Sequence, residues 1–551
     1  MTGVIELLPT RSVYRPDEAV AIEIRGLMPQ GAGPGRELTV RHLGDVRSAH
    51  PVQAGGRVDV GLLPVGDYGI ELASAGTVIA RTAVDVAADP RVVLRYGFTV
   101  DFRPGRDDID RFTDNLRRLH LTGVQFYDWA YRHADLNGGG EEYADALGQP
   151  VSLATVRALI EACHSVGTDA LGYAAVYAAG PHEWPKWQHD ALLSPTGAPY
   201  ALGDFLFLLD PAAEDWLAHF ADELSEAATR HGFDGFHLDQ YGYPKRAHRP
   251  DGAAVHVAES FSTMIHAVRA TLPSARLVFN NVNDFPVWSS PDAPQDAVYI
   301  EPWAPHTGLE HLARMVARAR VKAAGRPVVI AAYQHVYDDA EAERGDRATA
   351  LTMATLYSHG ATQLLCGEAD RILVDPYYVR NHVVEPGTAD LLRRWYDFVV
   401  EHGELLTAPG IDEVTGSYAG SYNDDVDVVY AEGGVPVTDP PAPGSVWRRI
   451  TRVAGGRLVV HLINLAGQDD TLWDAPRQPP TDTGPGILRI RRAGPNMPRV
   501  RVADPDRNGR LTDVAVTADG DYAHARLPAP HLWQLVLIDP AGDGATTPES
   551  D

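Results

Sequence analysis

Apolar residues in the middle of the chain recur as eight short runs, and a helical segment follows nearly every one of them. The helical segments have a period of 3.6 residues; in 107–119 the periodic apolar residues are Ile109, Phe112, Leu116 and Leu119. The runs that we interpret as strands are 96–102, 123–129, 169–177, 233–240, 276–283, 297–303, 327–333 and 360–368. The helical segments are 107–119, 152–166, 212–230, 255–271, 308–324, 344–358 and 388–401.

This alternation of β and α units is typical of a closed (β/α)8 barrel, also called a TIM barrel. One gap, 283–297, is a Pro-rich segment with no helical pattern, and we expect a loop there. A doubly wound open sheet is the competing architecture. Eight units and no Gly-rich phosphate loop favour the barrel, which we place at 92–406.

The two ends of the chain have the pattern of all-β domains. Short runs near the N-terminus alternate apolar and polar residues, as in VAIEI at 20–24, and predict a β-sandwich over 1–91. The expected strands there are 4–8, 19–24, 38–43, 58–63, 67–73 and 78–86. A second β-sandwich is predicted over 407–540, with buried strands at 457–465 and 531–538. We expect 541–551 to be a flexible tail.

The composition narrows the classes of partner. The 551 residues include 74 acidic and 48 basic side chains, a net charge of −26, which disfavours binding to nucleic acid or to an anionic membrane surface. Two cysteines, Cys163 and Cys366, cannot form a disulfide scaffold or a multi-cysteine metal site. No secretory signal or membrane span is visible, so we expect a cytoplasmic protein, or a secreted one if a signal peptide has been removed.

Acidic, amide and aromatic residues gather at the C-terminal ends of the predicted barrel strands, where such barrels carry their chemistry. Carboxylates there can accept hydrogen bonds from hydroxyl groups, and aromatic rings can stack on the C–H faces of a sugar. A phosphate ligand would instead need cations or a helix N-terminus. The ring therefore predicts a neutral, polyhydroxylated ligand, with no cofactor. Its members are Asp128, Trp129, Tyr173, Tyr177, Asp239, Gln240, Asn280, Asn281, Glu301, Trp303, Tyr333 and Glu368.

Asp239 and Glu301 are the strongest candidates for chemistry, because glycoside hydrolysis needs two carboxylates that face each other across the scissile bond. Strand alternation in FDGFHLD directs Phe236 and Leu238 toward the helices, and Asp239 toward the barrel axis. A lone acid at a strand end could equally cap the next helix or form an ion pair. Two matched acids beside aromatic residues favour the catalytic interpretation.

The remaining candidates are substrate-binding residues. We expect Trp129 and Trp303 to stack on sugar rings, His133 to reach a hydroxyl group, and Gln240 to orient the neighbouring Asp239. Packing in the barrel wall or simple solvation is the competing interpretation for each of them. Further candidates of this kind are Tyr173, Tyr177, Asn281, Tyr333 and Glu368. Asp424, Asp425 and Asp427 form an acidic run that we interpret as solvated loop charges rather than a calcium site, so no metal is expected.

Four segments, VQFYDWAYRHADL, GFDGFHLDQYG, VYIEPW and GATQLLCGEADRILVDPYYVRN, closely resemble glycoside hydrolase family 66. This family contains endo-dextranases and cycloisomaltooligosaccharide glucanotransferases. VYRPDEAV and LPVGDYGIEL are similar to its N-terminal immunoglobulin-like domain. SVWRRITR, RLVVHLINL and ADPD are similar to its C-terminal Greek-key β-sandwich. The resemblance implies α-1,6-glucan as the substrate and a retaining mechanism with a covalent glycosyl-enzyme.

The same resemblance implies roles for three acids. Asp239 corresponds to the nucleophile, Glu301 to the general acid/base, and Asp128 to a third acid that hydrogen-bonds the glucose of the −1 subsite. The sequence departs from the family at Ala174, where relatives often have Asn, and at Pro302, where a small aliphatic residue is usual.

Three functions remain open at this point: a hydrolase of α-1,6-glucan, a transglycosylase that forms cyclic isomaltooligosaccharides, and a non-catalytic carbohydrate-binding protein. The resemblance implies that cyclising relatives carry an extra module of about 90 residues between strands seven and eight. Here 26 residues separate Tyr333 from Gly360, which leaves no room for that module. We therefore expect linear products. The oligomeric state is left open.

Overall fold

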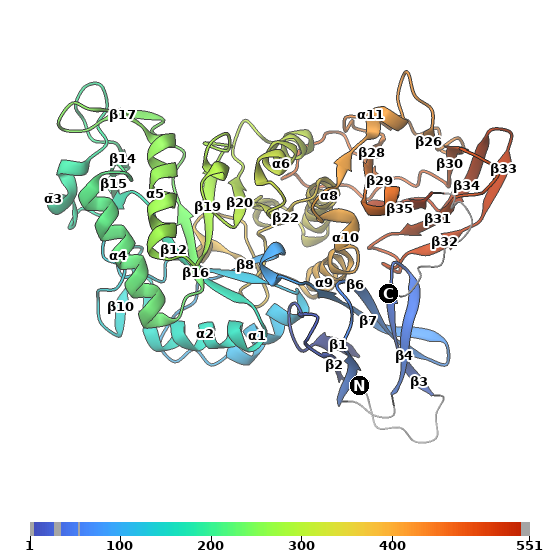
Figure 1. The fold of residues 1–551 in the computed structure, drawn as a ribbon, viewed down its shortest axis with the longest axis horizontal. Coiled ribbons are helices and arrows are strands. Elements are labelled where there is room, and N and C mark those ends of the chain that lie inside the picture. The colour runs from blue at the N-terminus through green and yellow to red at the C-terminus, as the bar shows by residue number, and fades with distance from the viewer. Residues whose placement is uncertain (1–4, 27–34, 53–55, 541–551) are drawn as a thin grey trace, which may run out of the picture.

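The centre of the molecule is a sheet of eight parallel strands surrounded by helices (Figure 1). The computed structural model describes residues 5–26, 35–52 and 56–540. Neighbours in the sheet follow chain order: β8 (Tyr96–Thr99), β9 (Gly123–Phe126), β12 (Asp169–Ala175), β16 (Gly235–Asp239), β19 (Arg276–Val282), β20 (Ala297–Glu301), β21 (Val328–Ile330) and β22 (Thr362–Gln363). The longer helices between and after them are α1 (Ile109–Arg118), α2 (Leu153–Ser165), α4 (Glu214–His231), α5 (Val257–Thr271), α6 (Leu309–Ala323), α8 (Ala342–His359) and α9 (Pro386–Glu401). The prediction of a barrel is confirmed.

The sheet closes where its first and last strands meet. The backbone N–H of Phe98 donates to the carbonyl of Cys366 at 3.1 Å. A Cβ atom at Gly367 would lie 2.2 Å from the backbone of Phe98, so only glycine permits this approach. β22 is shorter than the predicted run 360–368, because the chain turns into this seam instead of continuing as a regular strand. The segment 283–297 has no α-helix and contains one short 3-10 turn, η3 (Ser290–Asp292), as expected.

The two faces of the barrel strands differ in what they bury. Phe236 and Leu238 of β16 are fully buried among the outer helices. His237 lies between them in sequence and points to the axis, where its ring stacks on Tyr96 at 5.9 Å and meets Tyr299 edge-on at 4.7 Å. Side chains therefore fill the interior of the barrel at this level. A ligand can be bound only beyond them, at the C-terminal ends of the strands.

Two sheets precede the barrel. One contains β1 (Glu6–Pro9), β2 (Val20–Arg25) and β5 (Gly56–Gly61); the other contains β4 (Asp45–Val52), β3 (Arg36–His42), β6 (Gly66–Ser74) and β7 (Thr77–Val86). Buried aliphatic side chains from both sheets form one core. The expected strands are present, within the described residues, but β4 was missed. It is an edge strand with mostly exposed side chains, so no apolar alternation marks it.

Two sheets also follow the barrel and enclose a second β core. The larger has the order β25 (Asp412–Glu413), β28 (Val446–Arg452), β29 (Leu458–Asn464), β35 (Trp533–Asp539), β31 (Arg499–Ala503) and β32 (Thr512–Val514), with β27 (Val437–Thr438) beside β28. The smaller has the order β26 (Val426–Val429), β30 (Gly486–Arg491), β34 (Tyr522–Leu527) and β33 (Val516–Asp519). The buried strands predicted at 457–465 and 531–538 are confirmed as β29 and β35.

Helix α9 contacts both flanking β regions. Arg81 of β7 forms an ion pair with Glu401 at 2.7 Å, and the ring of Trp533 on β35 packs edge-on against Phe398 at 5.0 Å. The predicted tail 541–551 lies outside the described residues. Among the helices of the described segments, none is both long and apolar enough to cross a membrane.

Candidate active site

Asp239 and Glu301 lie at the C-terminal ends of β16 and β20, and β19 runs between these two strands. Asp239 follows the alternation of its strand, so its carboxylate points to the barrel axis as predicted. Both carboxylates therefore project from the same end of the barrel, one strand apart on either side of β19. The side chain that separates them comes from β19.

That side chain is Asn280, whose amide nitrogen contacts both acids. It donates to Oδ1 of Asp239 at 2.7 Å and to Oε2 of Glu301 at 3.0 Å. The distance between Oδ1 of Asp239 and Oε2 of Glu301 therefore cannot exceed the sum of these two hydrogen-bond lengths. That limit is shorter than the roughly 6.5–9.5 Å of inverting pairs and is close to the roughly 5–5.5 Å of retaining pairs. An inverting pair is more widely spaced because it must hold a water molecule in addition to the sugar, so the spacing here favours a retaining pair.

Each acid also accepts a hydrogen bond from a tyrosine. Tyr173 donates to Oδ2 of Asp239 at 2.8 Å, and Tyr333 donates to Oε1 of Glu301 at 2.8 Å. Both tyrosines were predicted from the sequence, as strand-end residues. The phenols fix the carboxylates in one orientation, and they favour the ionised form of each.

The two acids differ in protonation. Burial, and then the charge of Asp239, raises the pKa of Glu301 to about 7, although hydrogen bonds from Asn280, Tyr333 and Trp303 oppose the rise. Burial also raises the pKa of Asp239, and Asn280 and Tyr173 counteract it. Two charges this close repel each other, so ionisation of Asp239 favours the protonated form of Glu301.

Asp128 follows β9 and lines a small recess with His133 and Tyr173. Burial raises the pKa of Asp128 well above its usual range, and the charges of Asp145 and Asp239 add to the effect. Burial lowers the pKa of His133 to about 4, so its imidazole is neutral at pH 7 and can exchange hydrogen bonds with a hydroxyl group. Asp128 and His133 therefore share one recess with Tyr173, the tyrosine that donates to Asp239.

Trp303 lies beyond Glu301 and is partly exposed. Its backbone N–H donates to the side-chain oxygen of Asn283 at 2.7 Å, and its ring centre lies 5.9 Å from that of Tyr333. The indole therefore lies close to Tyr333, the tyrosine that donates to Glu301, and its stacking on a sugar stays a prediction.

The sequence comparison decides the family. The model of glycosyl hydrolase family 66 matches residues 64–537, which is most of the chain and includes all three acids. The chain belongs to glycosyl hydrolase family 66. Membership in this family places the chain among the glycoside hydrolases.

Two enzymes of Niallia circulans, both named cycloisomaltooligosaccharide glucanotransferase, are similar to this family 66 chain. They are 27% and 24% identical over 291 and 293 residues. These segments make up 47% and 48% of this chain, but only 29% and 30% of the two relatives. The matched part thus spans less than a third of the length of these curated enzymes.

The fold is shared with solved structures. A cycloisomaltooligosaccharide glucanotransferase of Paenibacillus sp., crystallised with cycloisomaltoheptaose, superposes with a TM-score of 0.84 at 18% identity. The superposition covers 97% of this chain and 100% of that one. The α-L-fucosidase isoenzyme 2 of Paenibacillus thiaminolyticus superposes with a TM-score of 0.53 at 11% identity, over 82% of this chain and 100% of that one. At these identities the similarity concerns the fold alone.

The structure corrects the role of Trp129 in this family 66 site. The indole is fully buried; its N–H donates to the carbonyl of Tyr173 at 3.2 Å, and its ring lies 4.7 Å from that of Phe233. It therefore packs in the barrel wall and offers no face to a sugar. The cause is the left-handed backbone of Asp128 (φ 52°), which breaks the two-residue alternation and turns the next side chain outward.

Three other candidates brace the site instead of facing it. Tyr177 is fully buried and donates to the carbonyl of Tyr243 at 2.6 Å. Gln240 donates to the carbonyl of Asn280 at 3.1 Å, which holds the end of β19 in place. Asn281 is fully buried and donates to the carbonyl of Tyr299 at 2.9 Å. The prediction that these side chains bind substrate is corrected, because their polar atoms are engaged with the backbone.

Glu368 also has a structural role. It forms an ion pair with buried Arg106 and accepts a hydrogen bond from Thr99 at 2.8 Å. Through Thr99 and Arg106, Glu368 joins the segment after β22 to the end of β8 and to the loop that follows it, beside the barrel seam. The sequence indicates only an acid at a strand end, because the arginine that neutralises it lies over 260 positions away along the chain.

Two site residues were not selected from the sequence. Asn280 was noted at a strand end, but its neighbour Asn281 was selected as the substrate-binding candidate. The strand alternation that directs Asp239 to the barrel axis also distinguishes Asn280, which faces the axis, from Asn281, which does not. Tyr378 lies after the last strand, and its ring stacks on that of Tyr127 at 4.2 Å, beside the acids. No pattern in the sequence indicates that this late segment returns to the site. In the acidic run, Asp424 and Asp425 form ion pairs with Arg491 at the protein surface.

Replacing Asn280 with alanine should shift the pH profile of kcat/KM to higher pH and lower its maximum by roughly 10–100-fold. The amide N–H groups stabilise both ionised carboxylates, so their loss raises the pKa of each. Initial rates between pH 4 and 9 measure the shift. Asn281→Ala is the matched control, since it removes a bracing side chain that touches neither acid. An unchanged profile in Asn280→Ala, or the same shift in both variants, would contradict the bridging role.

Proposed function

We propose that this chain is a retaining glycoside hydrolase that cleaves α-1,6-glucosidic bonds in dextran or isomaltooligosaccharides. The observation that carries the proposal is the pair Asp239 and Glu301, bridged by one side-chain nitrogen. The pair combines the spacing of a retaining enzyme with an acid, Glu301, whose pKa is raised to about 7 beside a second carboxyl group. A non-catalytic binding protein would have no need for either feature.

The proposed reaction has two steps. The carboxylate of Asp239 attacks the anomeric carbon, while Glu301 transfers its proton to the departing glycosidic oxygen. This breaks the C–O bond and leaves a glycosyl ester on Asp239. In the second step, ionised Glu301 accepts a proton from water, and the resulting hydroxide oxygen displaces Asp239. Both acids return to their starting states, and the anomeric configuration is retained.

The substrate class follows from the surroundings of the pair. Phenols and an indole surround the acids, which suits sugar hydroxyl groups and C–H faces. We propose that Asp128 and His133 hydrogen-bond the glucose in the −1 subsite, where such bonds strengthen as the ring flattens. The α-1,6 linkage is supported by the names of the two Niallia circulans relatives.

Those same names favour a second candidate, a transglycosylase that forms cyclic isomaltooligosaccharides. Both activities pass through the same glycosyl-enzyme and differ only in the acceptor, which is water or the far end of the same chain. Cyclisation requires that this end be held near the site, because closing a long loop costs entropy. Between β21 and β22 lie only the short helix α7 (Val336–Asp339) and α8, so no module fits there.

We therefore expect linear products from dextran. The enzyme is incubated with dextran, linear sugars are removed with an exo-acting glucosidase, and the remainder is analysed by mass spectrometry. Linear isomaltooligosaccharides, digested completely, are the expected result. A dominant resistant species at a multiple of the anhydroglucose mass would replace the hydrolase with the transglycosylase. No release of reducing ends at all would refute both.

A further inference from the structure

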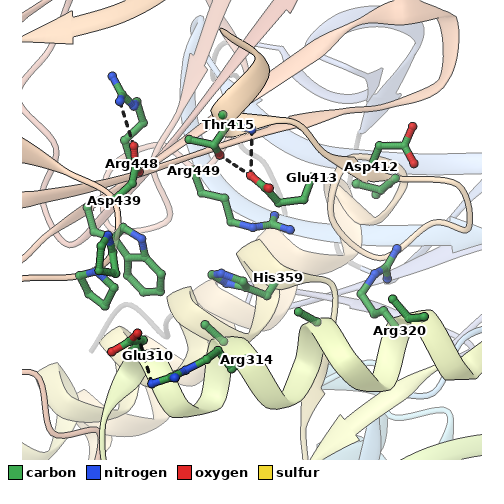
Figure 2. A pocket seen from close by; sticks show the side chains of 18 of the residues that line it. Glu310, Arg314, Arg320, His359, Asp412, Glu413, Thr415, Asp439, Arg448 and Arg449 are labelled. Carbon is green, nitrogen blue, oxygen red and sulfur yellow. Dashed lines mark hydrogen bonds and ion pairs between the residues drawn. The ribbon is translucent and has the colours of Figure 1, made fainter. Parts of the chain in front are cut away.

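A cavity of about 860 Å³ lies between α6 and the C-terminal sandwich (Figure 2). None of the three acids of the site lines it. Its walls come from α6, the end of α8, the segment 407–420 and β28. The volume falls in the range of roughly 300–1,000 Å³ that is usual for small-molecule sites. The cavity therefore has the size of a ligand site, and its charges indicate the kind of ligand.

Arg449 of β28 projects into this cavity, and no described residue supplies a counter-ion for it. Figure 2 shows its guanidinium between His359 and Glu413. It donates to the carbonyl of Ser358, but no carboxylate oxygen of the described residues lies within 4 Å of it. Its neighbour Arg448 is different, since it forms ion pairs with two aspartates at 2.8 and 3.0 Å. The alternation of β28 thus gives one arginine two partners and leaves the other facing the cavity.

A second arginine of the cavity is in the same state. Arg320 of α6 donates to the carbonyls of Gly360 at 3.0 Å and Ala408 at 3.3 Å, and within the described part of the chain it has no acidic partner. Burial lowers the pKa of Arg449 to about 10, and the charge of Arg320 acts in the same direction. A partly buried cation without a counter-ion is costly, so an anion between the two arginines would be stabilising.

The acids that line the cavity do not supply that charge. Glu413 acts on Arg449 only from a distance, because its carboxylate accepts hydrogen bonds from the backbone N–H of Thr415 at 2.9 Å and from the Thr415 hydroxyl. Glu310 forms an ion pair with Arg314 at 3.2 Å, at the lower left of Figure 2. Asp439 pairs with Arg448 and Asp412 with Arg452. The four carboxylates that line the cavity therefore have other partners, while neither Arg449 nor Arg320 has an acidic partner among the described residues.

We propose that this cavity is a binding site for a small hydroxylated oxyanion, with Arg449 and Arg320 holding its phosphate or carboxylate group. A guanidinium presents paired N–H donors that match the oxygens of either group. His359 can accept a hydrogen bond from a hydroxyl group of the same ligand. Its Nδ1 lies 2.7 Å from the carbonyl of Thr355 and donates to it, which leaves Nε2 as an acceptor. A sugar phosphate or a sugar acid has both features.

The test is calorimetric titration of the full chain at constant ionic strength. The probes are inorganic phosphate, glucose 6-phosphate, gluconate and, as the neutral control, glucose. We expect saturable binding of an anionic sugar and none of glucose; glucose 6-phosphate and gluconate distinguish the two head groups. Arg449→Gln should weaken binding at least tenfold. Arg526→Gln, an exposed and paired arginine on β34, is the matched control and should bind as the wild type does.

A second variant should change the affinity for the anion in the opposite direction. Glu413→Gln keeps an acceptor for Thr415 but removes the negative charge that acts on Arg449, so it should tighten anion binding at least threefold. A folding defect would not produce tighter binding. No saturable binding of any anionic probe, equal binding by Arg449→Gln and the wild type, or no gain in Glu413→Gln would each overturn the proposal. These titrations contain no glucan, so their outcome is independent of the proposed hydrolysis.

Discussion

Asp239→Asn should lower kcat on dextran by several orders of magnitude, with little change in Tm. Asparagine has nearly the same shape but cannot form the glycosyl ester, so the covalent step is lost. Each factor of ten corresponds to about 1.4 kcal/mol of lost transition-state stabilisation. Stability should hold because Asp239 is buried close to two other acids, Asp128 and Glu301, and removing its charge relieves repulsion.

Rescue by azide distinguishes a nucleophile from an acid that merely positions the substrate. In Asp239→Gly the small side chain leaves room for azide, which should attack the anomeric carbon directly and give a β-glycosyl azide. Asp519→Asn on β33 is the control, since this exposed aspartate lies far from the barrel. Near-normal activity of Asp239→Asn would show that Asp239 is not the nucleophile. Full activity of Asp239→Gly without any glycosyl azide would show the same.

Glu301→Gln should also lower kcat on dextran by several orders of magnitude, but the loss should depend on the leaving group. Glutamine cannot donate the proton that the departing sugar oxygen needs. A 4-nitrophenyl isomaltoside has a leaving group that needs no such proton, so its first step should be largely spared and the glycosyl-enzyme should accumulate. Burst kinetics of nitrophenol release measure this accumulation. Equal losses on both substrates would argue against Glu301 as the general acid.

The pH dependence provides a second readout for the same variant. The wild-type pKa of about 7 means that Glu301 is protonated below neutral pH and ionises above it, so kcat/KM should fall as the pH rises through 7. This limb should be absent in Glu301→Gln. A raised pKa in the folded state also means that folding is penalised once the acid must ionise. The variant should therefore be at least as stable as the wild type at pH 8.

The barrel and its two acids could be predicted because they depend on local periodicity. Apolar residues every two or every 3.6 positions identify the strands and helices, and the strand order of a barrel then follows from chain order. The same period of two predicted that Asp239 faces the barrel axis and that Phe236 faces the helices. The structure has both side chains in these positions. The edge strand β4 was missed because an edge strand with exposed side chains requires no such period.

The assignment of the other site residues required the tertiary structure. Whether Trp129 faces a sugar depends on one left-handed backbone angle at Asp128, and whether Glu368 is free depends on Arg106, far away in sequence. Arg449 illustrates the same limit, since nothing local distinguishes it from its paired neighbour Arg448. By itself the sequence determined which segments form the barrel and which acids end its strands, because these properties are set by short-range periodicity. Only the tertiary structure decided which polar groups have partners, because hydrogen bonds and ion pairs join residues that are distant along the chain.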